Sequence, residues 1–342
     1  MAPRKAFTLD YDDGMCGWAL LRAFSRIVLL IVTLCAQAVH LSAQVPSPDA
    51  QASFELTGRI QPPQSLPVYL QGATAPFEAI TEADLDGRFH FRKLTAGAYV
   101  VMVGALQRTV EVGSSLADSK GRVNVTIDLR NAEVEKNLGR KDRVSVRELS
   151  IPKEAWREYQ EAQKALGKRD VTAAVAHLKR AVELAPVFSA AWNHLGTIAY
   201  QSGQYVEAEI DFRKGLDAEP DAYAPLVNLG GVLINLAKWD QALEYNRQAV
   251  LKSPHDALAN SQLGMACFYA GQLGLAEKYL AAAKQIDPAH FSHPQVLLAE
   301  IHVRRNEPDA AAAELEDLLR RHPDLPDASR IKAQIARLRA GN

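Results

Sequence analysis

Few places in this chain combine residue types that could do chemistry. Ser150 and Lys153 stand three residues apart, the spacing of acylating serine enzymes whose lysine activates the hydroxyl. That chemistry needs a helix to bring the lysine beside the serine, and Pro152 between them disfavours a helix there. The sequence also contains no phosphate-binding glycine loop, no nucleophile elbow and no zinc-binding His-Glu motif. We therefore expect no catalytic residues and no enzyme.

Two further groupings could bind a metal, and neither has the full set of ligands. His290 and His293 have the spacing HxxH, but no third ligand lies nearby in the sequence. Glu82, Asp84 and Asp86 place carboxylates at alternate positions, yet the closing bidentate glutamate of a calcium loop is missing. Because a glycine follows Asp86, these acidic residues indicate a tight turn. We predict no metal and no cofactor.

The charges of the chain are almost balanced. In 342 residues, 39 basic and 40 acidic side chains give a formal net charge of −1. Nucleic acid and anionic membrane surfaces attract basic proteins, so neither is a favoured partner. The hydrophobic content of 48% and the charged content of 23% are ordinary for a soluble globular protein. Most of the chain should therefore fold, in two or three domains.

The first 43 residues have the pattern of a secretory signal peptide. Arg22 and Arg26 precede an apolar stretch, Ile27–Val39, and small residues up to Ala43 follow it. Acidic residues near the N-terminus do not suit such a leader, so Met15 is a candidate for the true start. We expect cleavage after Ala43. An uncleaved membrane anchor is the alternative, although the apolar stretch is marginal in length for a membrane span.

Cysteine usage excludes an internal disulfide in the cleaved chain. The three cysteines are Cys16, Cys35 and Cys267, and the first two lie in the leader. After cleavage Cys267 has no partner, so the protein must fold by burial alone. We expect Cys267 to be a small buried hydrophobe on an apolar helical face.

Residues 52–130 alternate between apolar and polar side chains in short runs, after a linker at 44–51. Alternation with a period of two indicates strands that are buried on one face, hence a sandwich. Asp86-Gly87 between two runs predicts a tight turn. The predicted strands are Phe54–Ile60, Val68–Gln71, Arg88–Leu94, Ala98–Gly104, Gln107–Val112 and Arg122–Leu129.

The run TEADLDGRFHFRKLTAGAYVVMV resembles the signature of carboxypeptidase-regulatory-like domains, also called prealbumin-like or collagen-adhesin B-type domains. Gly58 in the first predicted strand also resembles a glycine of that family. The resemblance implies a seven-stranded sandwich that serves as a spacer, a stalk or a sugar- or protein-binding module. The matching positions are Thr81, Asp84, Asp86, Gly87, Phe89, Phe91, Leu94, Gly97, Tyr99, Val101 and Val103.

The second half of the chain repeats every 34 residues, after a charged connector at 131–154. Prolines mark the period at Pro186, Pro220, Pro254 and Pro288, and a fifth follows 35 residues later at Pro323. A period of 34 with helix–turn–helix content is typical of tetratricopeptide repeats, and residues 155–325 resemble five of them. Such repeats bury their apolar faces only by stacking, so the last needs a polar cap. Residues 326–342 have the amphipathic pattern of that capping helix.

In tetratricopeptide repeats the first helices line a concave groove that takes an extended peptide. Carried over by position, the groove is aromatic, amide and hydroxyl in character and almost uncharged. Tyr159 and Gln163 stand where the family's dicarboxylate-binding members have Lys and Asn, so binding of a chaperone-type C-terminal tail is not expected. The groove positions are Trp156, Tyr159, Gln163, Asn193, Thr197, Tyr200, Gln201, Val227, Ile234, Asn235, Ser261, Met265, Phe268 and Tyr269.

These observations predict an exported, non-catalytic scaffold of the cell envelope, periplasmic or secreted, that binds a protein or peptide in the groove. The alternative is a carbohydrate- or cell-wall-binding protein that acts through the sandwich, with the repeats serving assembly. A leader that stays in place would anchor either protein to the membrane. Nucleic acid is not an expected partner.

Overall fold

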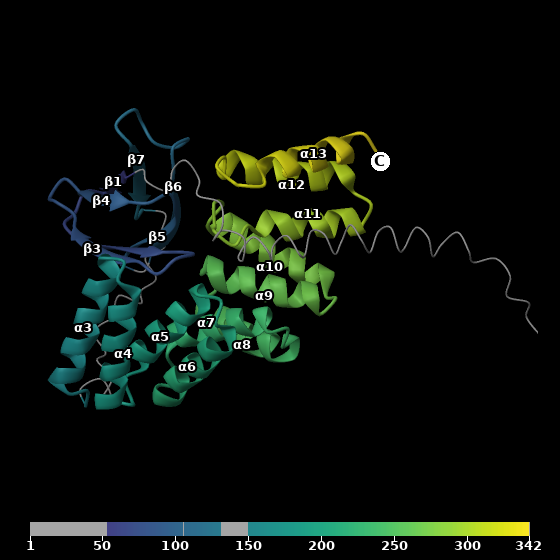
Figure 1. Cartoon of the computed structure of the whole chain (residues 1–342). Coiled ribbons are helices and arrows are strands. Elements are labelled where there is room, and N and C mark those ends of the chain that lie inside the picture. The colour runs from purple at the N-terminus through teal and green to yellow at the C-terminus, as the bar shows by residue number, and fades with distance from the viewer. Residues whose placement is uncertain (1–52, 105, 131–149, 342) are drawn as a thin grey trace, which may run out of the picture. The chain divides into compact units, whose positions relative to one another are not determined.

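The computed structural model describes residues 53–104, 106–130 and 150–341 (Figure 1). The predicted leader and residues 131–149 of the predicted connector lie outside the described residues. In the described part, seven β-strands precede a series of helices joined by short turns. The predicted fold class, an all-β sandwich followed by an all-α series of repeats, is confirmed.

The strands form two sheets, in the orders β4-β1-β7 and β3-β2-β5-β6. β1 pairs antiparallel with β4 and parallel with β7, and the pairs of the second sheet are antiparallel. The strands are β1 (Phe54–Gln61), β2 (Pro67–Gly72), β3 (Glu78–Glu82), β4 (Arg88–Leu94), β5 (Gly97–Val103), β6 (Leu106–Val112) and β7 (Arg122–Asp128).

The sandwich core forms because alternate residues of each strand point between the sheets. In β4, Phe89 and Phe91 are buried and their neighbours are exposed. The Phe89 ring lies against Gly58 of β1, where an added Cβ would lie 2.1 Å from the ring. Asp84 Oδ1 accepts hydrogen bonds from the backbone N–H groups of Asp86 and Arg88, which is turn chemistry.

β3 is absent from the strands that the alternation pattern predicts. It is an edge strand that pairs with β2 alone, and none of its residues is fully buried. Ile80 in its centre is 61% exposed. Because the apolar pattern reports burial on one face, a strand that buries no side chain leaves little signal in the sequence.

The helices of the described residues form five pairs and a final single helix. The pairs are α3–α4, α5–α6, α7–α8, α9–α10 and α11–α12. The helices are α3 (Lys153–Gly167), α4 (Val171–Leu184), α5 (Ser189–Gln201), α6 (Tyr205–Ala218), α7 (Tyr223–Asn235), α8 (Trp239–Lys252), α9 (Ala257–Tyr269), α10 (Leu273–Ile286), α11 (Pro294–Arg304), α12 (Pro308–Arg321) and α13 (Ala328–Arg339).

The turn inside each pair needs one residue with a positive φ angle. Glycine takes this conformation without strain, and Gly203 and Gly271 occupy it in the second and fourth pairs, each at φ 75°. The other three pairs have Arg169 at 61°, Ala237 at 55° and Asn306 at 61°. Arginine and alanine are unusual residues for this backbone conformation, so these two positions carry a conformational cost.

The last helix covers the end of the repeats. Half-buried apolar residues of α13, among them Ile331 and Ile335, pack against buried Ala311 and Leu315 of α12. The opposite side of α13 is exposed and includes Arg330 and other basic residues. This is the arrangement that a capping helix needs. None of the described helices is both long enough and apolar enough to cross a membrane.

Candidate functional site

The predicted groove residues lie on α3, α5, α7 and α9, the first helices of the first four repeats, and we call that side the groove face. The described positions divide by burial. Tyr159, Val227, Ile234, Ser261 and Phe268 are each at most 9% exposed, so they pack the repeats together. Half-buried or exposed are Trp156, Gln163, Asn193, Thr197, Tyr200, Gln201, Asn235, Met265 and Tyr269.

Two hydrogen bonds between side chains connect α5 with α7 across the groove face. Asn228 Nδ2 donates to Asn193 Oδ1 at 2.9 Å, and Asn235 Nδ2 donates to the Tyr200 hydroxyl oxygen at 2.9 Å. Asn228 is missing from the predicted set, which places Val227 at this point because it follows the 34-residue period. Both hydrogen bonds join residues 35 apart, and that spacing in the sequence could have identified Asn228.

Aromatic rings from the second helices enlarge the groove face. Tyr205 begins α6 and lies edge-on to Tyr200, with ring centroids 5.5 Å apart. Trp239 begins α8 and stacks on Tyr269 at 4.6 Å. The half-buried Met265 packs in the same apolar cluster. The groove face therefore combines amide groups, hydroxyl groups and flat apolar surface.

The described strands and helices fall in one compact unit, and the sandwich contacts the repeats at two places. We call the first place, where β2 and β3 meet α3, α5 and the α3–α4 turn, the near junction. Gln163 Nε2 donates to Glu78 Oε1 at 3.4 Å, and Gln201 Nε2 donates to the carbonyl oxygen of Gly72 at 3.1 Å. Thr197 lines the same contact, where the remaining cavity is only about 10 Å³. That is near the smallest space that holds one water molecule.

A half-buried pair of Glu78 and His194 lies at the centre of the near junction. His194 Nε2 is 3.3 Å from Glu78 Oε2, and His194 Nδ1 is 3.0 Å from the Tyr159 hydroxyl. Burial favours the neutral form of each group, but the mutual hydrogen bond and charges outweigh it: they raise the pKa of His194 and lower the pKa of Glu78. Burial and the Glu78 charge raise the pKa of Tyr159, which keeps its hydroxyl protonated.

At the near junction, contacts with the sandwich explain why Arg169 is tolerated in a turn where its φ angle is positive. Its guanidinium lies over the Phe77 ring at 4.5 Å, and its Nη2 donates to the Tyr99 hydroxyl at 3.2 Å. Both partners belong to the sandwich. A cation over an aromatic ring contributes about 0.5–2 kcal/mol, which offsets the cost of the positive φ angle.

The second place of contact, which we call the far junction, joins β6 and the β6–β7 loop to the last repeats. The backbone N–H of Thr109 donates to Asp287 Oδ2 at 3.0 Å. Glu111 Oε1 is 3.0 Å from Nδ1 of His322, which follows α12. Ser115 donates to Asp324 in the α12–α13 loop. The sandwich is thus attached both to the first two repeats and to the last two.

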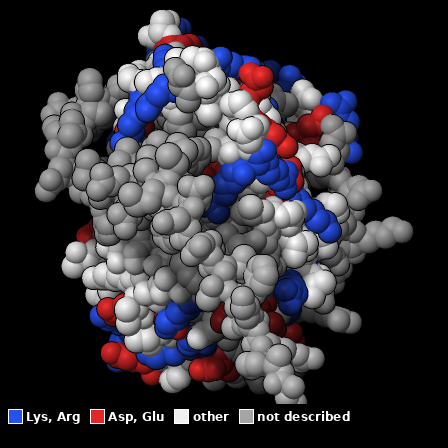
Figure 2. Space-filling view, turned by 90° about the vertical axis from the view of Figure 1, so that its right-hand side faces the viewer, with Lys and Arg blue, Asp and Glu red and all other residues white. Residues whose placement is uncertain are grey.

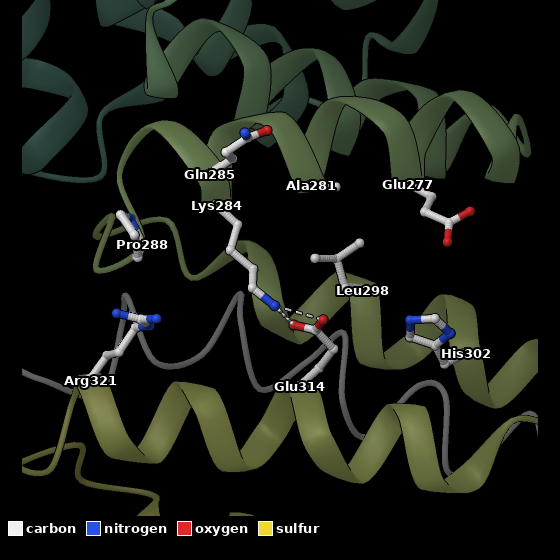
Figure 3. A pocket seen from close by; sticks show the side chains of 9 residues that line it. All are labelled: Glu277, Ala281, Lys284, Gln285, Pro288, Leu298, His302, Glu314 and Arg321. Carbon is white, nitrogen blue, oxygen red and sulfur yellow. Dashed lines mark hydrogen bonds and ion pairs between the residues drawn. The ribbon is translucent and has the colours of Figure 1, made fainter. Parts of the chain in front are cut away.

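A polar cavity of about 240 Å³ lies between α10, α11 and α12. Figure 3 shows Lys284 reaching from α10 to Glu314 on α12, and Lys284 Nζ is 2.7 Å from Glu314 Oε1. Arg321 at the rim is paired with Asp317, and His302 is paired with a glutamate. Because Lys284 and Arg321 already have carboxylate partners, the cavity has little attraction for an anionic ligand.

The residues that first suggested chemistry lie at the start of α3, before α11 and in α9. Lys153 is the first residue of α3 and Ser150 precedes that helix. His290 and His293 stand in the loop before α11, at the far junction. Cys267 is 2% exposed in α9, and burial raises the pKa of its thiol, which makes it a weak nucleophile.

Comparison with solved structures gives partial matches. "MamA 41-end from Desulfovibrio magneticus RS-1" is 21% identical, and the match covers 52% of this chain and 99% of that one, with a TM-score of 0.46. "YrrB: a TPR protein with an unusual peptide-binding site" is 25% identical, with 55% and 98% covered and a TM-score of 0.44. "PilW, widely conserved type IV pilus biogenesis factor" is 23% identical, with 55% and 86% covered and a TM-score of 0.49.

A curated human protein, "Cell division cycle protein 16 homolog", is 32% identical over 94 residues. The match covers 25% of this chain and spans only 15% of that protein. Sequence profiles described as tetratricopeptide repeat match residues 159–223, 228–290 and 268–335. These residues include most of the described helix pairs and the hydrogen bonds across the groove face. The helical part of this chain belongs to the tetratricopeptide repeat family.

Proposed function

We propose that this chain is an exported, non-catalytic scaffold that holds a protein partner by an extended segment lying on the groove face. Tetratricopeptide repeats bind protein or peptide partners, and the helical part of this chain belongs to that family. One observation carries the proposal: amide side chains on neighbouring repeats are positioned by mutual hydrogen bonds, beside accessible aromatic rings.

The amide groups suit the backbone of an extended peptide. An asparagine amide has two N–H donors and one carbonyl acceptor. Asn228 and Asn235 use N–H groups to bond Asn193 and Tyr200, which leaves their carbonyl oxygens as acceptors for backbone N–H groups of the partner. Because the inter-repeat bonds fix the amides in advance, little side-chain entropy is lost on binding.

Apolar side chains of the partner would pack on the rings. The Trp239–Tyr269 stack and Met265 present flat, polarizable surface at a low cost in conformational entropy. On the face shown in Figure 2, basic and acidic residues are interspersed. Because the proposed groove positions Asn235, Met265 and Tyr269 are uncharged, we expect recognition by shape, stacking and hydrogen bonds, with a weak dependence on salt.

The proposed location is the cell envelope, periplasmic or secreted, and it rests on the sequence of the leader. Positive residues before an apolar stretch and small residues up to Ala43 support cleavage and export. A leader that stays in place would make the same scaffold a membrane-anchored protein.

A second candidate function belongs to the sandwich, which we propose to be a carboxypeptidase-regulatory-like domain. Gly58 supports this identity, because a Cβ atom at this position would clash with the Phe89 ring. Tyr69 on β2 is 37% exposed beside the exposed Ile80 of β3. Accessible aromatic rings are surfaces on which sugars stack, so this ridge supports carbohydrate binding as the alternative.

The first test is recovery of partners from the native envelope fraction with the full chain as bait. We expect Asn228→Ala with Asn235→Ala to weaken binding about tenfold, since two hydrogen bonds at about 0.5–1.5 kcal/mol each are lost. Gln248→Ala is the matched control, because that amide bonds Glu244 on the exposed side of α8. Equal recovery by the double variant, at unchanged helicity, would exclude the groove face as the binding site.

A further inference from the structure

The third helix pair, α7–α8, carries groove residues but none of the hydrogen bonds with the sandwich given above. Asn228 and Asn235, two amides of the proposed binding site, both lie on α7. The near junction involves the first two repeats, and the far junction involves the last two. The third repeat therefore depends for its stability on its own two helices and on the neighbouring repeats.

One core position of the repeats changes character in this pair. At this position, which recurs every 34 or 35 residues, the second helix of each repeat contributes one buried side chain. Four of the repeats have a large apolar residue there, and the third repeat has an asparagine. The residues are Leu178, Phe212, Asn246, Leu280 and Leu315, each at most 4% exposed.

The amide of Asn246 is poorly satisfied at this position. Its Nδ2 donates to the carbonyl oxygen of Gly230 at 3.4 Å, which is long for a hydrogen bond, and its Oδ1 is buried without a partner among the described residues. The side chain packs on Gly230 as closely as Phe212 packs on Gly196. A buried oxygen that has lost water and gained no donor destabilises a fold relative to an apolar group of similar shape.

A second glycine of α7 also faces a buried amide. Gly231 stands where α5 has Thr197 and α9 has Met265. Together with Gly230 it lowers the intrinsic helix stability of α7, because glycine is a poor helix former. The side chain of Gln262 fills the space beside Gly231, where its Nε2 is 2.4 Å from the position of an added Cβ. The Oε1 of Gln262 is buried and has no partner in the described part of the chain.

The turn between α7 and α8 adds a further cost. Its residue with a positive φ angle is Ala237, where the second and fourth repeats have Gly203 and Gly271. The second repeat, by comparison, has a glycine in this turn, an apolar side chain at the core position and a single glycine in its first helix. Backbone strain, helical glycines and unpaired amide oxygens thus act together on one interior helix pair.

We propose that the third repeat is an opening point of the helical array: α7 and α8 unfold locally and refold while the repeats on either side stay folded. The sandwich holds those neighbours together, since it is attached to the first two repeats and to the last two. The inference deepens the proposed function and rests on it in one respect, because the opening point carries Asn228 and Asn235. A segment that binds only the folded α7 stabilises it by mass action, so binding and ordering are coupled there. The opening itself needs no partner.

The test is hydrogen exchange of the full chain, without a partner and at constant pH and temperature, expressed as a protection factor for each helix. Local opening exposes the amides of one unit at a lower free energy than global unfolding does. We expect the best-protected amides of α7 and α8 to exchange about tenfold faster than those of α5–α6 and of α9–α10. Protection in α7–α8 as high as in either neighbouring pair would overturn the proposal.

A variant at the core position tests the cause. In Asn246→Leu, the third repeat gains the residue that the fourth has at Leu280, and the unpaired oxygen is removed. We expect the protection of α7–α8 to rise about tenfold and the melting temperature to rise by about 3 °C. Asn260→Leu is the matched control, because that buried amide donates to the carbonyl oxygens of Pro254 and Asp256 at 2.8 Å each. The control should lower the melting temperature.

A second variant acts on the same repeat without changing its core. Ala237→Gly relieves the turn and should raise the protection of α7–α8 about threefold, and more than that of α3–α4. If neither this variant nor Asn246→Leu raises the protection of α7–α8, the proposal is wrong. These experiments contain no partner, so a failure of the proposed groove binding would show separately, in the recovery experiment.

Discussion

At the scale of single residues, the positions that depart from the usual pattern of a helical repeat are the informative ones. The turn inside each helix pair suits glycine, yet Arg169 and Ala237 occupy it in the first and third repeats. Arg169 gains contacts with Phe77 and Tyr99 of the sandwich in return. The methyl side chain of Ala237 is too short to make such contacts, so nothing offsets the cost of its positive φ angle.

We predict that Ala237→Gly stabilises the protein. The substitution removes a backbone strain of about 1–2 kcal/mol, from which the extra entropy of glycine in the unfolded chain subtracts about 0.5–1 kcal/mol. The reverse change at the equivalent turn, Gly271→Ala, should destabilise by a similar amount, since φ there is 75° and space is open. Thermal unfolding of both variants measures the effect, and a lower melting temperature for Ala237→Gly would contradict it.

A second prediction concerns the closest packing in the sandwich. In Gly58→Ala, the added methyl group would lie 2.1 Å from the Phe89 ring, so the ring or the strand must move. Overpacking of this kind costs about 1–3 kcal/mol. Gly274→Ala is the control, because nothing lies within 4 Å of that position in α10. Denaturant unfolding should show a loss at position 58 and none at position 274.

At the scale of elements, the sequence predicted the helices that recur with a regular period and the strands that bury one face. The 34-residue period located the helix pairs, and alternation located six of the seven strands. β3 was missed because its residues bury no apolar face. Asn228 was missed because a strict 34-residue period leads from Asn193 to Val227. The hydrogen-bond partner of Asn193 lies 35 residues away, at Asn228. Contacts between the sandwich and the repeats join residues up to 211 apart, as at Glu111 and His322, and no local pattern encodes them.

The capping helix gives a prediction at this scale. Removing residues 326–342 would expose the apolar side of α11 and α12 that α13 covers, including Leu315. Stability of a repeat array depends on the interface between neighbours, so the last pair should fray first. We expect a lower melting temperature and self-association by light scattering. Removing only residues 340–342 is the control and should change neither; an identical result for both truncations would contradict a capping role.

At the scale of the whole molecule, the sandwich contacts the helical repeats at the near junction and at the far junction. The near junction holds it on the first two repeats through the half-buried pair of Glu78 and His194. The far junction holds it on the last repeats through the contacts of Thr109 with Asp287 and of Glu111 with His322. The groove face between them carries the fixed amides and the stacked rings. The middle repeats are therefore where we expect a partner segment to bind first.

The near junction also predicts how stability depends on alkaline pH. The pKa of His194 is raised in the folded state, so its contribution is complete below about pH 6.5 and is lost as the pH rises through the raised value. The pKa of Glu78 is lowered, so its contribution is lost only in strong acid. We expect His194→Gln to flatten the decline in melting temperature between pH 6 and pH 9, relative to His255→Gln. An unchanged slope would show that the ion pair does not hold the junction.

The central claim, that a partner segment lies on the groove face, is tested most directly by site-specific photo-crosslinking in producing cells. A photoreactive phenylalanine analogue replaces the exposed Asn235 on the groove face in one sample and the exposed Gln248 on the outer side of α8 in another. Our account predicts a discrete crosslinked partner from position 235 and none from position 248. Adducts from position 248 alone, or equal adducts from both positions, would contradict it.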